Sequence, residues 1–245
     1  MTIFWAAVLG LVQGLTEFLP VSSSGHLVIV QHFIPGFSQP GVLFDVILHL
    51  ATLLAVVYFF RNKIFTLGRK YYLLLIIGTI PAGLFGLLFQ SQLERTFGDF
   101  RMVGLELIIT GILNFLIDRV KTTDKPLTKT NSFLVGIAQA IAIIPGISRS
   151  GSTIFTGVKL GVDRKKVAEF SFLLSIPAIM GANVMQVLSR GFTSTFNPIY
   201  YLTGFIFAFI SGFLSINLVL KTLAQRKFTY FGIYCLVIGA IVFLI

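Results

Sequence analysis

The sequence predicts an all-α, polytopic membrane protein with six transmembrane helices and two re-entrant helical hairpins, arranged as an inverted-topology repeat. Three observations support this prediction. The 245 residues are 56% hydrophobic and only 11% charged, with a mean hydropathy of +0.92, whereas an ordinary soluble domain carries about 25% charged residues. A polar motif within apolar sequence occurs twice, and most Lys and Arg residues lie in short loops. We therefore expect a single membrane domain over residues 1–245.

The duplicated motif lies at the centre of two broken apolar segments. Its copies, 126 positions apart, run from Gly10-x-x-Gln13 to Ser22-Ser23-Ser24-Gly25-His26 and from Gly136-x-x-Gln139 to Ser148-Arg149-Ser150-Gly151-Ser152. Pro20 or Pro145 interrupts each copy, and the apolar pieces on either side are too short to span a bilayer comfortably. Segments 3–33 and 132–160 are therefore predicted as re-entrant hairpins, and a kinked spanning helix is the alternative for each.

Six further apolar runs are long enough, or nearly long enough, to cross a bilayer as helices. In chain order they are residues 42–60, 71–90, 102–117, 167–188, 199–220 and 228–245. The single cysteine, Cys235, lies in the last run and is interpreted as a packing residue without a disulfide partner. The first residues lack a basic region and a small-residue cleavage site, so they are interpreted as part of the mature protein.

The positions of the basic residues predict the orientation of these segments. Most of the 19 Lys and Arg residues lie in four loops, 61–70, 118–129, 163–166 and 221–227. If both hairpins return to the side from which they enter, all four loops fall on one face, which the positive-inside rule makes cytoplasmic. Both termini, with Arg95, Arg101 and Arg190, then lie outside the plasma membrane. The net charge of +10 is therefore a topology signal, and nucleic acid is not an expected partner.

The 126-residue offset continues beyond the motif and predicts two related halves. It pairs Phe44 with Phe170 and Gly78 with Gly204. Residues 1–120 form the first predicted repeat and residues 132–245 the second. Each repeat contains one hairpin and three spans, an odd number, so the second repeat must enter the membrane upside down. In inverted repeats the broken helices of both halves meet near the midplane around a shared ligand.

The first break carries the side chains best suited to chemistry. Gln13 and Glu17 are four residues apart, so they share one helical face that points toward Pro20. Beyond the break, Ser22 and Ser23 can cap the next helix, and His26 follows Ser23 by three residues. Capping alone would explain the serines. Ionisable Glu17 and His26 within an apolar hairpin favour a functional site, because charge is costly in a membrane.

The second break is typical of an anion site. Ser148, Arg149 and Thr153 lie at the start of a helix whose first amide groups have no intrahelical partner. Arg149 adds a permanent forked donor, which suits a phosphate group. The alternative is that Arg149 only neutralises Glu17. Asp45, His49 and Glu169 are interpreted as structural support, Lys159 as an interfacial residue, and Glu106 has no assigned role.

Two long motifs resemble the undecaprenyl-diphosphate phosphatase family, the bacitracin-resistance membrane phosphatases of bacteria. They are Gln13-Gly14-Leu15-Thr16-Glu17-Phe18-Leu19-Pro20-Val21-Ser22-Ser23-Ser24-Gly25-His26 and Pro145-Gly146-Ile147-Ser148-Arg149-Ser150-Gly151-Ser152-Thr153. A third stretch, Glu169-Phe170-Ser171-Phe172-Leu173-Leu174-Ser175-Ile176-Pro177, is also similar to the family. The resemblance therefore extends over essentially the whole chain.

This resemblance implies an activity and the residues that carry it. The expected reaction removes the terminal phosphate of a C55 polyprenyl diphosphate on the outer side of the membrane, with a divalent cation, Mg²⁺ or Ca²⁺. Glu17, Ser23, His26 and Arg149 match the catalytic residues of the family. The remaining expected residues contact substrate, namely Gln13, Ser22, Ser148 and Thr153, and Glu17 is the expected metal ligand. Gln13 stands where many relatives have a glutamate, and Gln13 can serve neither as a base nor as an anionic metal ligand.

Several alternatives follow from the residues. Ser23 can attack phosphorus while Glu17 or His26 accepts its proton, His26 can be the nucleophile, or either group can activate water. A lipid-phosphate flippase or an anion transporter would share the inverted repeat and broken helices. Simple anion binding, however, does not require Ser23 and His26 beside Glu17, and a structural scaffold requires none of the buried charges. Membrane lipids are expected partners, and a homodimer is compatible with the sequence.

Overall fold

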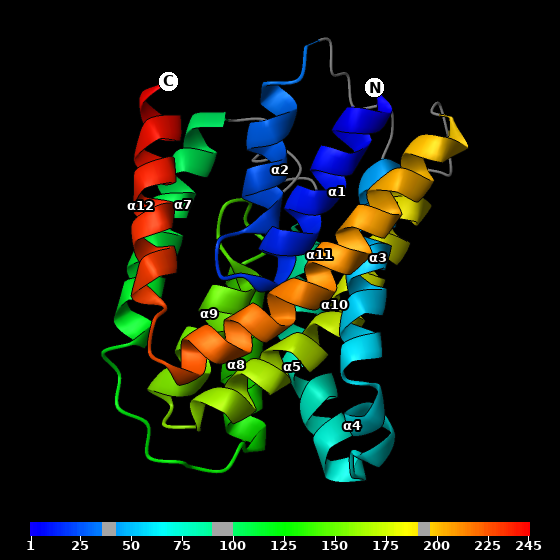
Figure 1. Cartoon of the computed structure of the whole chain (residues 1–245). Coiled ribbons are helices and arrows are strands. Elements are labelled where there is room, and N and C mark those ends of the chain that lie inside the picture. Colours follow the sequence, from blue (N-terminus) through cyan, green and yellow to red (C-terminus); the bar gives the residue numbers. More distant parts are fainter. Residues whose placement is uncertain (36–42, 90–99, 191–196) are drawn as a thin grey trace.

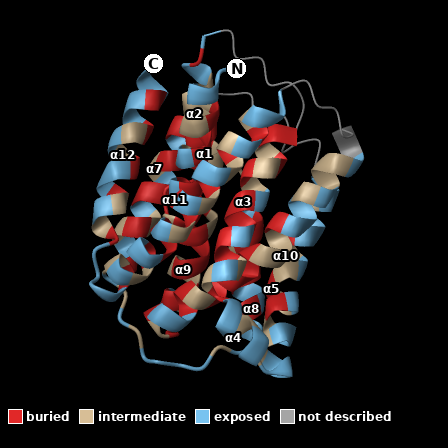
Figure 2. Cartoon of the chain, turned by 45° about the vertical axis from the view of Figure 1, so that its right-hand side comes forward, coloured by how far each residue is buried: buried red, intermediate tan, exposed pale blue. Residues whose placement is uncertain are grey.

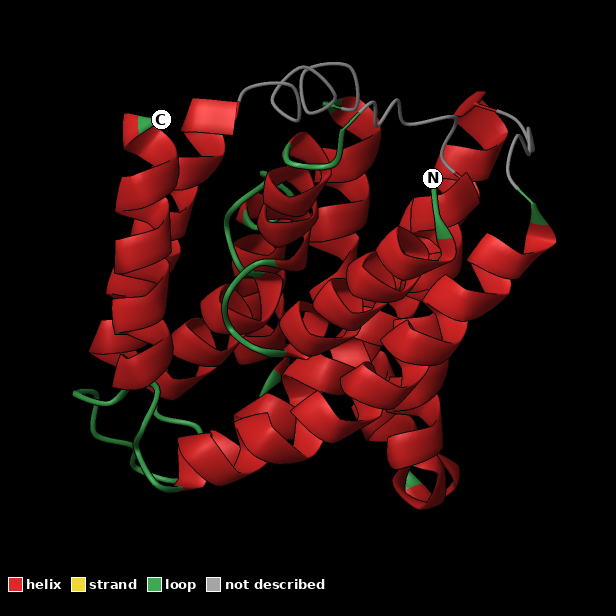
Figure 3. Cartoon of the chain, turned by 45° about the horizontal axis from the view of Figure 1, so that its top comes forward, coloured by secondary structure: helices red, strands yellow, loops and turns green. Residues whose placement is uncertain are grey.

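The chain folds entirely into helices in the part that the structure describes. The computed structural model describes residues 1–35, 43–89, 100–190 and 197–245, and within these residues it contains no β-strand (Figures 1 and 3). The helices are α1 Ile3–Phe18, α2 Ser23–His32, α3 Leu43–Phe59, α4 Arg61–Thr66, α5 Arg69–Leu88, α7 Phe100–Ile117, α8 Lys129–Ile141, α9 Arg149–Lys159, α10 Arg164–Arg190, α11 Pro198–Ala224 and α12 Thr229–Leu244. The predicted all-α class is confirmed.

The predicted spans correspond to six of these helices. Helices α5, α7, α10 and α11 are long and apolar enough to cross a membrane. Helices α3 and α12 are shorter, with 17 and 16 residues, about 25 Å at 1.5 Å per residue. Some predicted positions lie outside the described part, namely residues 42 and 90 at the ends of predicted spans, Arg95, and the side chain of Arg190. One feature was not predicted, because the loop expected at 61–70 contains helix α4.

Large apolar side chains cover the outside of the bundle. Figure 2 shows that the buried residues face inward and the exposed residues face outward along the helices. Many of the exposed residues are apolar, including Ile76, Leu84, Leu214 and Val237. A surface of this kind would be unstable in water over so large an area, whereas lipid solvates it. The fold is that of an integral membrane protein.

Each broken segment forms a helical hairpin whose two arms return to the same end of the bundle. Figure 1 shows that α1 runs inward from the N-terminus and that α2 runs back toward the same end. In the second hairpin, the amide of Lys125 donates to the carbonyl of Gly161 at 3.0 Å. The residues that precede α8 and follow α9 therefore lie side by side, which a spanning helix over 132–160 would not allow.

The four basic loops lie together at the end of the bundle opposite both termini (Figure 1). Arg164 donates to the carbonyl of Val120 at 2.6 Å, and the amide of Thr229 donates to Asp118 at 2.8 Å. Lys63 and Glu169 form an ion pair that connects α4 to α10. These contacts place the loops on one face, as the hairpin prediction requires.

Close glycine contacts pack the helices of the two halves against one another. A Cβ atom on Gly10 of α1 would lie 2.3 Å from the carbonyl oxygen of Gly204 on α11, and one on Gly136 of α8 would lie 2.4 Å from that of Gly78 on α5. The 126-residue offset converts the first pair into the second. The division into repeats 1–120 and 132–245 stays a prediction, and these equivalent contacts support it. Small residues allow helices to approach this closely in lipid.

The glycine contacts lead to a prediction about stability. Gly10→Ala and Gly136→Ala should each lower the thermal midpoint of the detergent-solubilised protein, because forcing a methyl group into such a contact costs about 1–3 kcal/mol. Gly83→Ala on α5 is the matched control, since no heavy atom lies within 4 Å of its Cβ position. Unchanged midpoints for both contact variants would contradict the close packing of α1 on α11 and of α8 on α5.

Candidate active site

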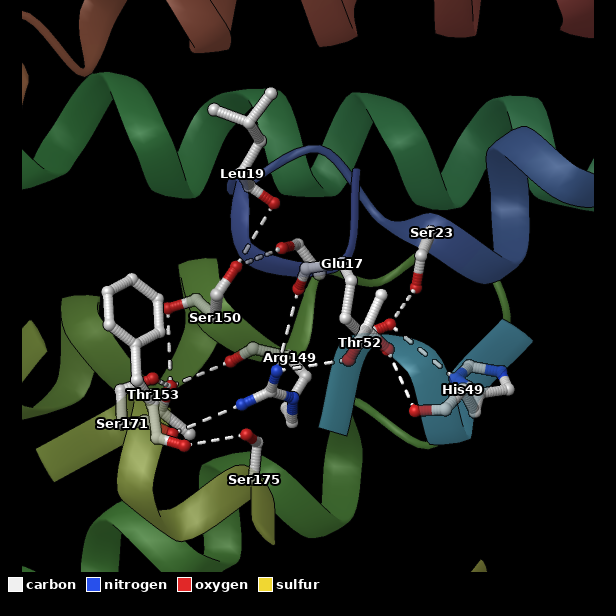
Figure 4. Close-up of polar contacts among 12 residues, drawn as sticks. Glu17, Leu19, Ser23, His49, Thr52, Arg149, Ser150, Thr153, Ser171 and Ser175 are labelled. Atoms are coloured by element: carbon white, nitrogen blue, oxygen red, sulfur yellow. Dashed lines mark hydrogen bonds and ion pairs between the residues drawn. The ribbon is translucent and has the colours of Figure 1, made fainter. Parts of the chain in front are cut away.

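The two hairpin breaks meet inside the bundle. The hydroxyl of Ser150 in α9 donates to the carbonyl of Leu19 in the first break at 3.1 Å (Figure 4). A Cβ atom on Gly25 would lie only 3.1 Å from the Cα of Gly146. Because each break interrupts a helix, backbone groups and polar side chains from both halves converge on one interior position.

Glu17 is the centre of this polar group. Its side chain is 6% exposed, so its charge requires direct compensation. Ser23 Oγ donates to Glu17 Oε2 at 2.7 Å, and Gln13 Nε2 donates to the same oxygen at 3.0 Å. On the other carboxylate oxygen, Arg149 Nη2 lies 3.1 Å from Oε1 (Figure 4). The predicted residues Gln13, Glu17, Ser23 and Arg149 therefore form one contact network.

Gln13 connects Glu17 to His49 on α3. The nitrogen of the Gln13 amide must face Glu17, because a carboxylate oxygen can only accept a hydrogen bond. The same Nε2 lies 3.0 Å from His49 Nδ1. With Gln13 as the donor, His49 accepts at Nδ1 and carries its proton on Nε2. His49, predicted as structural support, thus orients the amide that contacts Glu17.

Arg149 is held by a second set of contacts from α9 and α10. It is the first residue of α9, directly after the N-cap Ser148, whose hydroxyl accepts from the Gly151 amide at 3.1 Å. Its Nη1 donates to the carbonyl of Ser171 at 3.1 Å, and the Ser171 hydroxyl lies 2.6 Å from Thr153 Oγ1. Ser148 and Thr153 therefore position Arg149 and the N-terminus of α9 beside Glu17.

The predicted residue His26 makes its hydrogen bonds outside this network. It is 7% exposed, with Nδ1 2.8 Å from the carbonyl of Ser22 and Nε2 2.8 Å from the hydroxyl of Tyr234 on α12. Ser22 adopts a φ of 70°, and its hydroxyl accepts a long bond from the Gly25 amide, at 3.4 Å. In this arrangement Ser23 is bonded to Glu17, while His26 is bonded to the break and to α12.

Helix α7 carries residues that were not predicted. Thr110 donates to the carbonyl of Gly146 and accepts from the amide of Ser148, both at 2.9 Å. Asn114, one turn further on, donates to the carbonyl of Pro20. Gly146 has a φ of +86°, and a Cβ atom there would lie 2.6 Å from that of Glu106. The sequence contains one pattern that could have indicated these residues: Glu106, Thr110 and Asn114 recur every four positions, so they share one face of an apolar span.

The oxygen ligands available for a divalent cation are few. Among the described residues, no group of three or more His, Cys, Asp or Glu side chains could hold a metal ion. Glu17 is the carboxylate of the network, and Gln13 Oε1 is a buried oxygen without a hydrogen-bond partner in the described part of the chain. These oxygens fit a cation that takes its other ligands from a phosphate substrate and water, as Mg²⁺ usually does.

Comparisons with known proteins identify the family of this chain. The family described as bacitracin resistance protein BacA matches residues 6–241. An undecaprenyl-diphosphatase of Syntrophotalea carbinolica is 41% identical over 100% of this chain and 99% of its own length. Proteins of the same name from Carboxydothermus hydrogenoformans and Methanobrevibacter smithii are 42% and 39% identical, and each match covers at least 95% of both chains.

The family match extends from α1 into α12, and it includes both hairpin breaks and the network around Glu17. The matches to two of these relatives cover 99% and 98% of their own lengths. The chain therefore belongs to the bacitracin resistance protein BacA family.

Proposed function

We propose that this protein hydrolyses undecaprenyl diphosphate to undecaprenyl phosphate and inorganic phosphate. This reaction would recycle the lipid carrier of cell-wall synthesis and confer bacitracin resistance, as the family description suggests. The observation that carries the proposal is the buried carboxylate of Glu17, bonded to Ser23 Oγ at 2.7 Å and to Arg149 at 3.1 Å. A hydroxyl, a base and a fixed cation are thereby adjacent within a membrane protein.

The site suits a phosphate headgroup for electrostatic reasons. Arg149 has five N–H donors in a planar fork, and the described contacts use only its Nη1, toward Ser171, and its Nη2, toward Glu17. The N-termini of α2 and α9 begin at Ser23 and Arg149, and helix N-termini favour anions. The terminal phosphate would therefore lie between Ser23 and Arg149, and the prenyl chain would lie among the membrane lipids.

The geometry favours Ser23 as nucleophile and Glu17 as its base. Ser23 Oγ would form a bond to the terminal phosphorus while its proton passes to Glu17 Oε2, and undecaprenyl phosphate would leave. Water would then hydrolyse the phosphoserine and release inorganic phosphate. Direct attack by water, or by His26, remains the chemical alternative. Arg149 stabilises the charge on the transferred group, which is the main requirement of phosphoryl transfer.

We infer that a divalent cation, Mg²⁺ or Ca²⁺, assists the reaction. Glu17 and the buried Oε1 of Gln13 would contribute ligands, and the substrate and water would supply the others. When bound, such an ion neutralises charge on the diphosphate. Gln13 cannot supply the second carboxylate that a glutamate would bring to this position, so the ion would depend strongly on the substrate for binding.

The arrangement of loops supports an outer-facing site. The positive-inside rule would place the four basic loops in the cytoplasm and both termini outside the plasma membrane. The α1–α2 hairpin, which supplies Glu17, Ser23 and His26, would then enter from the outer side. Lipid substrate and membrane lipids are the partners that we propose, without nucleic acid.

Removing Arg149 tests the proposed activity. The purified protein should release phosphate from a polyprenyl diphosphate, and chelation of divalent cations should stop the release. Arg149→Ala should lower the rate by about 100-fold or more, because one preorganised charge donor typically contributes that much. Arg69→Ala, at the exposed start of α5, should retain the rate. Absence of release by the unaltered protein with Mg²⁺ or Ca²⁺ would favour a transporter.

A trapped intermediate identifies the nucleophile. Substrate labelled in its terminal phosphate should leave acid-stable label on Ser23 after a rapid quench, because the serine phosphate forms before water attacks it. Ser23→Ala should abolish the label, and Ser24→Ala, the adjacent hydroxyl, should retain it. Label on a histidine would identify His26, rather than Ser23, as the nucleophile. Reproducible absence of label at full turnover would favour direct attack by water.

Cysteine labelling tests the orientation. In a Cys235→Ser background, which contains no other cysteine, Thr2→Cys should react with a membrane-impermeant maleimide in intact cells. Lys125→Cys, in a basic loop, should react only after the membrane is permeabilised. The reverse pattern would place the basic loops outside and would overturn the orientation.

A further inference from the structure

Tyr234 on α12 contacts the candidate catalytic histidine directly. Its hydroxyl lies 2.8 Å from His26 Nε2. The two rings are also stacked, with an interplanar angle of 12° and centroids 5.6 Å apart. The two residues are separated by 208 positions in the sequence, so the contact joins the first hairpin to the last helix. Neither the family motifs nor the Glu17 network includes Tyr234.

The hydrogen bonds determine which nitrogen of His26 carries the proton. A backbone carbonyl can only accept, so the 2.8 Å contact with Ser22 requires a proton on Nδ1. In the neutral ring Nε2 then has a free lone pair, and the Tyr234 hydroxyl donates to it. Ser22 and Tyr234 thus bond to opposite sides of the ring and set both its tautomer and its orientation.

We propose that Tyr234 is a positioning residue that orients His26 through its Nε2 atom, while the Ser22 carbonyl keeps the ring proton on Nδ1. This inference rests on the proposed function, because it assumes that His26 acts on the phosphate or on water. Nδ1 is hydrogen-bonded to the backbone carbonyl, so Nε2 is the nitrogen that would exchange a proton, once the Tyr234 hydroxyl that occupies its lone pair yields to the phosphate or water. Tyr234 does not touch Glu17, Ser23 or Arg149 in any described contact, so its effect passes through His26.

A purely structural role for Tyr234 would give different results from a positioning role. As a structural link between α2 and α12, the hydroxyl would affect stability, and its loss would leave the catalytic rate constant of the folded protein unchanged. As a positioning residue, it should change the nitrogen resonances of His26 and the catalytic rate constant. The protein contains three histidines, so the ring-nitrogen spectrum is simple enough to assign with single His variants.

The experiment compares two tyrosines on one helix. Tyr234→Phe retains the stacked ring and removes the hydroxyl, and Tyr230→Phe makes the same change one turn away, at a side chain that is 67% exposed. For Tyr234→Phe we expect kcat to fall about tenfold, the effect of losing one buried hydrogen bond at a reacting group, with KM unchanged. The His26 Nε2 resonance should shift. Tyr230→Phe should alter neither quantity.

The unaltered protein provides a test that does not depend on any variant. Its ¹⁵N spectrum should show His26 as a neutral ring protonated on Nδ1, and protonation on Nε2 would overturn the proposal. A loss of rate in Tyr234→Phe with no change in the His26 resonances would also overturn it. If the unaltered protein releases no phosphate, the proposed function fails, whereas the spectra still decide the contact between Tyr234 and His26.

Discussion

The negative charge of Glu17 is the constraint on which the rest of the site depends. A buried carboxylate is stable only when donors and a counter-charge surround it. Here the counter-charge, Arg149, comes from the other half of the chain and lies 3.1 Å away. Both hairpins must therefore meet, and α7, through its bonds to Gly146 and Pro20, holds the two breaks at this position. The Glu17–Arg149 ion pair therefore contributes to the stability of the interior as well as to the chemistry that we propose.

Hydropathy and motif spacing predicted the fold class because a membrane leaves few alternatives. Only α-helices and closed β-barrels satisfy every backbone group within a membrane, and apolar runs of this length predict helices. The predicted bounds of the spans were close to the observed helix bounds. Helix α4 was not predicted, because its residues were expected to form a loop. A six-residue helix between two apolar spans has no periodic signal that distinguishes it from a basic loop.

The contacts of the site could be predicted from the sequence where the residues are close along the chain, but not where they are distant. Gln13, Glu17 and Ser23 lie on one hairpin, so their spacing indicated a shared face. Nothing in a local pattern joins Tyr234 to His26 or Asn114 to Pro20, because these pairs depend on how α12 and α7 pack. The catalytic roles of Glu17, Ser23, His26 and Arg149 stay predictions. The structure adds which groups contact each: Ser23 contacts Glu17, whereas His26 contacts Tyr234.

The equivalent glycine contacts of the two halves have a consequence for stoichiometry. An exact duplication would generate two identical reaction centres related by an approximate two-fold axis. The 126-residue offset instead places Ile143 opposite Glu17, Ser23 opposite Arg149 and Ser152 opposite His26. The two predicted repeats share equivalent glycine contacts, whereas their matching positions carry different side chains. Glu17 and Arg149 therefore form a single pair across the two breaks, and the site that we propose would hold one headgroup at a time.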